Sequence, residues 1–310
     1  MIKLEPINQT KLLGLDKFLN EFIRLFENDD FPNKILLSGV KGQGKSTLAY
    51  HFINYVLSKD DNFKYDKNNF KINKESHTFK TIINETNDNL SVIDVNTDKK
   101  SIDINQIREL INNLNKSSFN TKPRFVLIDN IELLNISSIN ALLKILEEPN
   151  QNIYFILINN NKKILPTLIS RCINYKISLT NSESLTIANY LLDGKLYESL
   201  NDDLINYYST PGNIYNLFKF AEVNHYNLAD LNLKEFLKIM IKDNHYKKNP
   251  SIKFLFFELI ESYFRKMHKS FALNFDNKYS YFLKRISNTK IYNLDEEILI
   301  NEFYEEILNG

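Results

Sequence analysis

Residues 38–47 of the chain read Ser38-Gly39-Val40-Lys41-Gly42-Gln43-Gly44-Lys45-Ser46-Thr47. This stretch fits the phosphate-binding loop pattern G-x-x-x-x-G-K-[ST], whose defined positions are filled by Gly39, Gly44, Lys45 and Ser46. The apolar residues 35–37 before it predict a buried strand, and residues 48–57 after it predict a helix. A strand, a glycine turn and a helix N-terminus together form a cradle for anions, because backbone N–H groups and the positive end of the helix dipole meet there.

The residue types in this loop predict how it would hold a nucleotide. Lys45 is expected to reach the β- and γ-phosphates, and the Ser46 hydroxyl is expected to bind magnesium. Three of the seven glycines of the chain fall in the loop, where they let the backbone close on phosphates without a Cβ in the way. The predicted ligand is ATP or ADP with Mg²⁺, and the predicted nucleotide-binding residues are Gly39, Lys41, Gly42, Gln43, Gly44, Lys45, Ser46 and Thr47.

Composition narrows the class of protein. With 310 residues the chain is expected to form two or three domains. No apolar run approaches the roughly 20 residues that span a bilayer, and no signal-peptide pattern starts the chain, so we expect a cytoplasmic protein without a membrane anchor. The single cysteine, Cys172, excludes an internal disulfide, and no Cys/His spacing predicts zinc. A net charge of +1 gives no overall attraction to nucleic acid.

A second landmark is the apolar strand Arg124-Phe125-Val126-Leu127-Ile128, which ends in Asp129. Downstream of a phosphate loop, such a strand predicts the Walker B element, whose aspartate holds magnesium. ATPases that hydrolyse through an Asp-Glu version of this element use the glutamate to polarise the attacking water. Asn130 stands at that position here, and an amide cannot take a proton. Glu132 is expected to project elsewhere, so the sequence indicates weak or absent ATP hydrolysis.

Other apolar patterns predict further elements of an α/β domain. Helical spacing is seen at 16–27 and at 104–114, where Asp103 or Ser101 is the expected cap, and in a helix that Ser137 is expected to cap. Strands are expected at 91–95, 153–158 and 173–177. Asn159 follows the fourth of the predicted strands, and its side chain is a candidate sensor of the γ-phosphate. The alternative is that the three asparagines form a turn, which is the favoured interpretation for Asn160 and Asn161.

Two later segments carry a family resemblance. They are Asn140-Ala141-Leu142-Leu143-Lys144-Ile145-Leu146-Glu147-Glu148-Pro149 and Leu165-Pro166-Thr167-Leu168-Ile169-Ser170-Arg171-Cys172. Together with the phosphate loop they resemble the clamp-loader branch of the AAA+ ATPases, most closely the delta-prime type of bacterial DNA polymerase III. The resemblance covers about residues 10–180 and is fainter towards the C-terminus.

The resemblance implies a subunit of a machine that places a ring-shaped sliding clamp on primed DNA. Its implied partners are gamma/tau-type and delta-type clamp-loader subunits, the clamp, and primer-template DNA reached through the complex. Arg171 stands at the position of the family's arginine finger, which reaches the ATP site of a neighbouring subunit. The resemblance implies that the chain is part of the DNA polymerase III holoenzyme, but it implies no polymerase activity of the chain itself.

The sequence also departs from members of that family. Motor subunits carry Asp-Glu at Walker B and an arginine in a G-S-x-R lid motif, whereas this chain has Asp129-Asn130 and Gly212-Asn213-Ile214-Tyr215. Some delta-prime proteins contain a four-cysteine zinc module, and residues 58–90 contain no cysteine. These departures favour a stator over a motor.

The predicted fold is an α/β AAA+ P-loop NTPase domain with a parallel sheet and flanking helices, followed by helical domains. We expect the nucleotide-binding domain at 1–178, with an insertion or long loop at 58–90. A small helical lid is expected at 179–222, where Ser182 or Ser184 would open one helix and Pro211 another. An all-α collar for oligomerisation is expected at 223–310, with one apolar stripe from Phe254 to Met267 and another of Ile298, Phe303, Ile307 and Leu308.

Three other functions stay open at this point. The first is an active AAA+ ATPase motor of the gamma/tau type, against which Asn130 and Tyr215 count. The second is a P-loop kinase of a small metabolite, disfavoured by the Ser170-Arg171-Cys172 element and the long helical tail. The third is a DNA-binding module acting alone, disfavoured by the near-zero net charge.

Overall fold

The computed structural model describes residues 4–96, 99, 101–116, 120–147, 152–205, 209–248, 250–270, 280–282, 284–286, 288–289 and 295–309. The chain separates into two compact units, Met1–Glu183 and Ser184–Gly310. Each unit is considered by itself below. The finer division into a lid at 179–222 and a collar at 223–310 stays a prediction. None of the described helices combines the length and the hydrophobicity that a membrane span needs.

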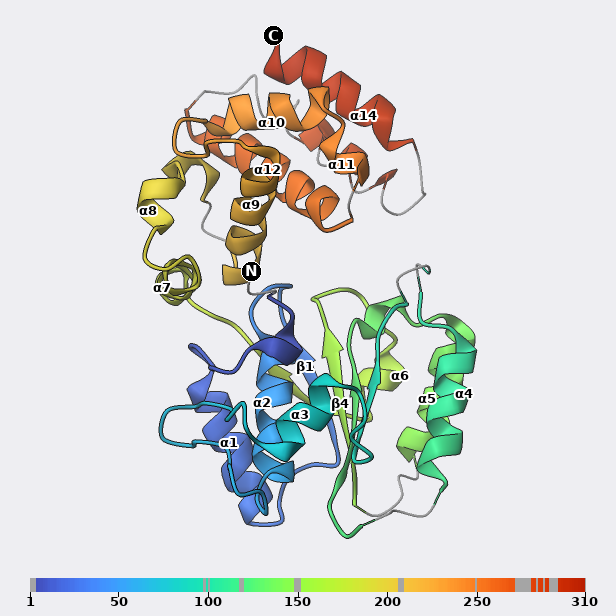
Figure 1. Ribbon diagram of the computed structural model, residues 1–310. Helices are drawn as coiled ribbons and strands as arrows, with labels where there is room; N and C mark the ends of the chain where they lie inside the picture. Colours follow the sequence, from blue (N-terminus) through green and yellow to red (C-terminus); the bar gives the residue numbers. More distant parts are fainter. Residues whose placement is uncertain are drawn as a thin grey trace. The chain divides into compact units, whose positions relative to one another are not determined.

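The first unit is built on a five-stranded sheet (Figure 1). Its strands are β1 (Lys34–Ser38), β2 (Leu90–Ile93), β3 (Arg124–Ile128), β4 (Ile153–Asn159) and β5 (Ile173–Lys176). They lie in the order β2-β3-β4-β1-β5, and every neighbouring pair is parallel. Since β1, β3 and β4 are nearly wholly buried, they read as continuous apolar runs, as strands covered on both faces do.

Helices cover both faces of this sheet, as Figure 1 shows. One face carries α1 (Asp16–Glu27), α2 (Lys45–Leu57) and α3 (His77–Ile83), and the other carries α4 (Ile104–Leu114), α5 (Ile136–Glu147) and α6 (Pro166–Ile169). Two short 3-10 helices, η1 (Pro6–Asn8) and η2 (Ile131–Leu133), complete the unit. The predicted parallel sheet with flanking helices is therefore confirmed.

Helix starts follow from local capping chemistry. Asp103 accepts hydrogen bonds from the backbone of Asn105 and Gln106 and closes a capping box, as expected for α4. The predicted cap of α5 is wrong: the helix begins at Ile136, so Ser137 lies inside it. Asn135 takes the capping role, because its Oδ1 accepts from the Ser138 N–H at 2.8 Å.

Residues 58–90 contain local structure of their own. Two isolated β-bridges join Lys71 to Lys11 and to Asp66, and α3 follows with Ser76 as its cap. Asp61 accepts hydrogen bonds from the Ser76 hydroxyl and the Thr78 N–H, so the start of α3 is tied to the segment after α2. This segment packs on the α1–α2 face through Tyr65, Ile72, Phe79 and Ile82.

The second unit is helical in its described part. Its elements are α7 (Asn181–Leu191), whose first three residues belong to the first unit, α8 (Leu196–Ser199), η3 (Asp202–Leu204), α9 (Pro211–Asn224), α10 (Leu233–Lys242), α11 (His245–Lys248), α12 (Pro250–Ser270), α14 (Glu296–Phe303) and the π-helical turn η4 (Tyr304–Leu308). Its core is aromatic, and the fully buried large side chains include Phe236, Phe256, Phe264, Phe282 and Phe303.

Three expectations for the helical unit have different outcomes. Pro211 does begin α9. Neither Ser182 nor Ser184 caps α7, because Thr180 Oγ1 accepts from the Glu183 N–H and the Glu183 carboxylate accepts from the Thr180 N–H. Of the second predicted stripe, Phe303, Ile307 and Leu308 are buried, but Ile298 is 60% exposed, so it does not belong to the core. The side chain of Phe254 and residue Pro149 lie outside what the structure describes.

Candidate nucleotide site

The phosphate loop connects the end of β1 to the start of α2. Gly42 and Gly44 have φ of 87° and 85°, in the left-handed region that glycine adopts without a steric penalty. At Gly39 the constraint is space, because a Cβ there would stand 2.3 Å from the backbone oxygen of Ile177. Sequence and geometry therefore agree that this turn needs its three glycines.

Lys45 is the buried cation of the loop. Its ammonium donates hydrogen bonds to the backbone oxygens of Gly39 at 2.9 Å and Val40 at 2.8 Å, and the residue is only 3% exposed. Burial lowers the pKa of Lys45 to about 8, and the negative charges of Asp129 and Glu132 oppose that shift. The ammonium is thus held inside the cradle at the place where phosphate would replace the two carbonyls as its partner.

Ser46 and Asp129 meet directly. The Ser46 hydroxyl donates to Asp129 Oδ2 at 2.5 Å, which joins the first turn of α2 to the end of β3. Burial raises the pKa of Asp129, and the bond from Ser46 opposes the shift. Two adjacent hard oxygen donors fit Mg²⁺, which takes few protein ligands and completes its shell with phosphate and water. No cluster of three or more acidic, histidine or cysteine side chains that could hold a metal occurs among the described residues.

Asn130 is fixed by hydrogen bonds at both ends of its amide. Its Nδ2 donates to Asp94 Oδ1 at 2.7 Å, and its Oδ1 accepts from Asn160 Nδ2 at 2.8 Å. The Asn160 backbone N–H donates in turn to Glu132 Oε2 at 3.3 Å. The amide therefore links residues that follow β2, β3 and β4 at one edge of the sheet. Glu132 lies nearer this site than its offset in sequence suggests.

The candidate sensor Asn159 is engaged in a turn. Its Oδ1 accepts from the Lys162 N–H at 3.1 Å, and its Nδ2 donates to the Lys162 oxygen at 2.9 Å. Its backbone oxygen accepts from the Gly39 N–H at 3.2 Å, so β4 continues alongside the start of the phosphate loop. Asn159 thus lies next to the loop, while its side chain closes a turn; the sensor role stays a prediction.

The remaining loop residues differ in exposure. Lys41 is exposed, and Thr47 is half-buried at the start of α2. The Oε1 atom of Gln43 is buried without a hydrogen-bond partner in the described part of the chain, and it would lie 3.0 Å from a Cβ at Gly39. An unpaired acceptor beside the glycine turn is a group that a bound ligand or water could satisfy.

Arg171 lies near the amino end of β5, whereas the phosphate loop lies at the carboxyl end of β1. It precedes β5, and in the parallel pairing of β1 with β5, Ile35 is level with Ile173 and Ser38 with Lys176. The loop that follows Ser38 is therefore displaced from the start of β5 by the length of that strand, about 10 Å. The guanidinium of Arg171 donates from Nη1 to the Thr167 oxygen at 2.8 Å and from Nη2 to the Glu147 carboxylate.

Comparison with known proteins identifies the family. A family model described as "DNA polymerase III, delta subunit" matches residues 14–181, which is more than half of the chain. The chain belongs to this clamp-loader family of DNA polymerase III. The resemblance seen in the sequence motifs is thereby confirmed.

Individual clamp-loader relatives extend this result. The delta-prime subunit of DNA polymerase III from Buchnera aphidicola (subsp. Schizaphis graminum) is 26% identical over 293 residues, covering 88% of this chain and 84% of the relative. The gamma subunit of the same organism is 29% identical over 59% of this chain, which spans about half (48%) of that relative. A gamma subunit-related protein from Thermotoga maritima has the same fold, with a TM-score of 0.50, 18% identity and coverage of 91% of this chain and 95% of that one.

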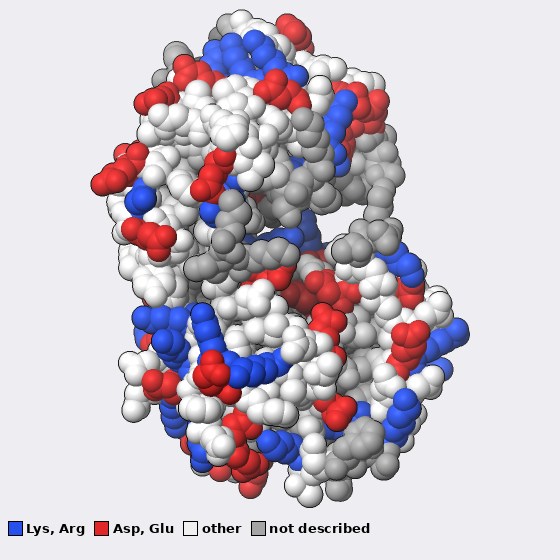
Figure 2. All heavy atoms as spheres, in the orientation of Figure 1, with Lys and Arg blue, Asp and Glu red and all other residues white. Residues whose placement is uncertain are grey.

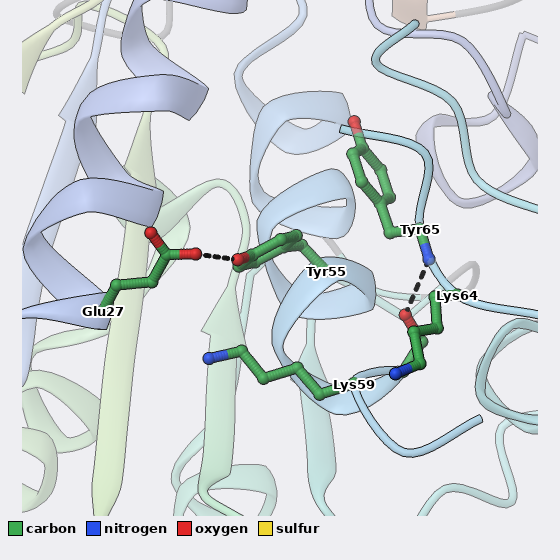
Figure 3. A pocket seen from close by; sticks show the side chains of 6 residues that line it. Glu27, Tyr55, Lys59, Lys64 and Tyr65 are labelled. Carbon is green, nitrogen blue, oxygen red and sulfur yellow. Dashed lines mark hydrogen bonds between the residues drawn. The ribbon is translucent and has the colours of Figure 1, made fainter. Parts of the chain in front are cut away.

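The clamp-loader domain also contains a pocket away from the nucleotide site. It has a volume of about 330 Å³ and is lined by Glu27, Tyr55, Ser58, Lys59, Lys64 and Tyr65 (Figure 3). The Tyr55 hydroxyl donates to Glu27, and the Lys59 ammonium lies 5.2 Å from the centre of the Phe26 ring. The pocket lies at the C-terminal end of α2, one helix length or about 20 Å from the phosphate loop.

Sequence reasoning missed several polar partners in this clamp-loader domain. Asp94 could have been found, because it directly follows β2 and parallel strands bring their carboxyl ends to one edge. Glu147 gave no such signal, since it lies 24 positions before Arg171 with β4 between them. The link between Asn160 and Asn130 carries the same signal as Asp94, since Asn160 directly follows β4 and Asn130 lies two residues after β3.

Proposed function

We propose that this chain is a delta-prime-like clamp-loader subunit that binds ATP or ADP with Mg²⁺ without efficient hydrolysis and supplies Arg171 to a neighbouring subunit's ATP site. The observation that carries the proposal is the contrast between a complete phosphate loop and an amide, Asn130, at the position of the catalytic glutamate.

Nucleotide binding is supported by the geometry of the cradle. The glycine turn, the buried Lys45 ammonium and the Ser46–Asp129 pair stand together where β1 and β3 end. Backbone N–H groups at the start of α2 add the positive end of the helix dipole. On this proposal Lys45 binds the β- and γ-phosphates, while Ser46 and Asp129 hold magnesium directly or through water.

Weak hydrolysis is supported by the chemistry of Asn130. A carboxylate in this place accepts a proton from the attacking water, whereas an amide does not. The amide is also occupied, since Asp94 and Asn160 are its hydrogen-bond partners. Glu132 is a carboxylate close by, but it accepts the backbone N–H of Asn160.

A role of Arg171 in another subunit is supported by its place in the sheet. It lies at the amino end of β5, and the chain's own phosphate loop lies beyond the carboxyl end of β1. A guanidinium is permanently charged and planar, which suits the charge that develops on a transferred phosphoryl group. Since it cannot serve its own loop from there, we assign it to the ATP site of an adjacent subunit.

The proposed partners are gamma/tau-type and delta-type subunits, the sliding clamp, and primer-template DNA reached through the complex. Charge supports an indirect contact with DNA. Figure 2 shows Lys and Arg interspersed with Asp and Glu on the visible face, and the net charge of the chain is +1. Free binding to DNA by this chain alone would call for a more basic surface.

The test combines a magnesium-dependent nucleotide-binding titration with a steady-state ATPase assay on the purified chain. Binding without turnover is the expected result. Turnover at about 1 per second or faster would instead make the chain a motor subunit. Absence of binding would overturn the nucleotide part of the proposal and leave Arg171 to be tested separately. In the assembled complex Arg171→Ala should reduce ATP turnover while leaving this chain's own nucleotide binding intact.

A further inference from the structure

The carboxylate of Glu147 holds the guanidinium of Arg171 from a different element of the fold. Arg171 follows α6, and Glu147 is the last residue of α5. The Nη2 atom donates to Glu147, while the Nη1 atom donates to the Thr167 oxygen in α6 at 2.8 Å. Because the two terminal nitrogens are bound from two elements, both the position and the plane of the guanidinium are fixed.

The platform that carries Glu147 is rigid. Leu142 and Leu146 of α5 are fully buried against the sheet, and the Lys34 ammonium of β1 donates to the Leu146 oxygen at 3.0 Å. Side chains held on packed helices are positioned more accurately than side chains on loops.

Stability does not account for a glutamate at this place. An acidic side chain in the last turn of a helix meets the negative end of the helix dipole, which disfavours it. Its ion pair with Arg171 is half-exposed, with the two side chains 54% and 30% exposed, and pairs of this kind contribute little to folding.

The guanidinium keeps donors available in this arrangement. Arginine has five N–H groups, and two of them are engaged by Thr167 and Glu147. Its Nε is buried without a partner in the described part of the chain, so this N–H does not face outward, and the donors that remain for an external group are the second N–H groups of Nη1 and Nη2. The side chain is therefore oriented by its own subunit but not saturated by it, as a group that acts on an external phosphate must be.

We infer that Glu147 is a positioning residue for Arg171: it fixes the guanidinium in the geometry in which Arg171 serves the neighbouring subunit's ATP site. This inference rests on the proposed function of Arg171. Glu147 itself touches no nucleotide and acts only through the arginine. Pre-organisation of this kind lowers the entropy lost when the guanidinium meets the phosphate.

The experiment uses the complex assembled with the cognate clamp-loader subunits, and it measures kcat and KM for ATP. Glu147→Ala should lower kcat about two- to fivefold, the range to which the free energy of an exposed ion pair converts, with KM unchanged. Glu147→Gln keeps a hydrogen-bond acceptor and should fall between the wild type and Glu147→Ala. Glu109→Ala, which removes an exposed glutamate from α4, is the matched control and should leave kcat unchanged.

Arg171→Ala and the double variant separate the possible failures. If Glu147 acts through Arg171, adding Glu147→Ala to Arg171→Ala causes no further loss of kcat. An equal loss in both backgrounds would overturn the inference and assign Glu147 a separate structural role. Full kcat in Glu147→Ala with reduced kcat in Arg171→Ala would overturn the inference and leave the proposed function standing. Full kcat in Arg171→Ala would overturn both. A melting curve of each isolated variant should match the wild type, because the pair is exposed.

Discussion

Asn130 donates its amide N–H to the carboxylate of Asp94 at 2.7 Å, so the residue in the position of a catalytic glutamate is paired with an acid at the end of the neighbouring strand. Hydrolysis needs a carboxylate at the end of β3, where it can accept a proton from the attacking water. In this chain the carboxylate, Asp94, follows β2, and the residue after β3 is an amide. Because the two side chains are paired, a variant designed to hydrolyse ATP has to change both Asn130 and Asp94.

We predict that Asn130→Glu alone does not produce an efficient ATPase. The new carboxylate would face Asp94, and two like charges at hydrogen-bond distance cannot both stay ionised. The backbone of Asn130 also has φ of 54°, which asparagine tolerates better than glutamate. The double variant Asp94→Asn/Asn130→Glu restores an acid–amide pair with the acid in the place of the catalytic glutamate. It should turn over at least about tenfold faster than Asn130→Glu, since a positioned general base contributes roughly a hundredfold or more.

The assay is steady-state ATP hydrolysis by the isolated chain with magnesium, with Asp94→Asn alone as the control that should stay inactive. Equal rates for the single Asn130→Glu variant and the double variant would show that Asp94 does not govern this position.

Nucleotide affinity should weaken in alkaline solution through Lys45. Burial lowers the pKa of this ammonium to about 8 in the free site, whereas a bound phosphate favours the protonated form. Above pH 8 binding must therefore take up a proton. The dissociation constant should rise about tenfold from pH 7 to pH 9, since affinity falls at most tenfold per pH unit beyond the pKa.

The measurement is a binding titration at several pH values, and proton uptake can be followed by calorimetry in buffers of different ionisation enthalpy. Lys45→Arg is the matched control, because a guanidinium stays protonated throughout this range. The nucleotide affinity of this variant, plotted against pH, should show no bend at pH 8. A bend of the same size in Lys45→Arg would attribute the effect to another group.

His51 should make folding stability fall in acid. Its ring is fully buried: Nε2 lies 3.0 Å from the Gln9 oxygen and must carry the proton, so Nδ1 accepts from the Tyr65 hydroxyl at 2.8 Å. Burial lowers the pKa of His51 to about 4, below its unfolded value of 6.5. The contribution of the neutral His51 ring to the free energy of unfolding is thus complete above pH 6.5. It is lost as the pH falls towards 4, and the total loss is about 3 kcal/mol.

Urea unfolding at pH 7, 5.5 and 4.5 measures this loss. His51→Gln should be less stable at pH 7 but should lose less stability between pH 7 and 4.5 than the wild type. Parallel pH profiles for the two proteins would count against a buried neutral histidine.

Gly39→Ala should disrupt the phosphate loop. The added Cβ would lie 2.3 Å from the Ile177 backbone oxygen, so the loop or the residue that follows β5 must move. We expect loss of nucleotide binding and a destabilisation of more than about 2 kcal/mol, as backbone strain produces. Gly194→Ala is a useful comparison, because its Cβ would meet no atom of the described residues within 4 Å although its φ is +83°. There only the left-handed conformation is penalised, by about 1 kcal/mol, and binding should survive.

Much of the sheet domain could be predicted from local sequence. The phosphate loop, the apolar run ending in Asp129 and the helix at 16–27 each depend on neighbours in sequence, and α1 indeed spans Asp16–Glu27. The order of the strands brings Ser46 to Asp129, 83 residues apart, as the paired motifs implied.

What escaped prediction depends on contacts between distant segments. The partner of the Asn159 side chain is Lys162, a contact that the strand pattern did not indicate, and the sensor role of Asn159 stays a prediction. Ser137 is of a residue type that often caps helices, but the helix starts one residue earlier, at Ile136, and so Asn135 takes the capping role. Glu147, the partner of Arg171, comes from helix α5 beyond β4, and no spacing in the chain encodes that pair.

The parallel sheet gives the molecule a direction. The phosphate loop lies at the carboxyl ends of the strands, and Arg171 lies at the amino end of β5. The nucleotide that we propose the chain binds and the arginine that we propose it supplies therefore lie at opposite ends of the sheet. Subunits that associate through such unlike surfaces do so head to tail, and they form rings or helices but not two-fold dimers. On the proposed function, a subunit that supplies an arginine to its neighbour but does not hydrolyse ATP takes one fixed position in such a ring, and this position defines an order for ATP hydrolysis by the other subunits.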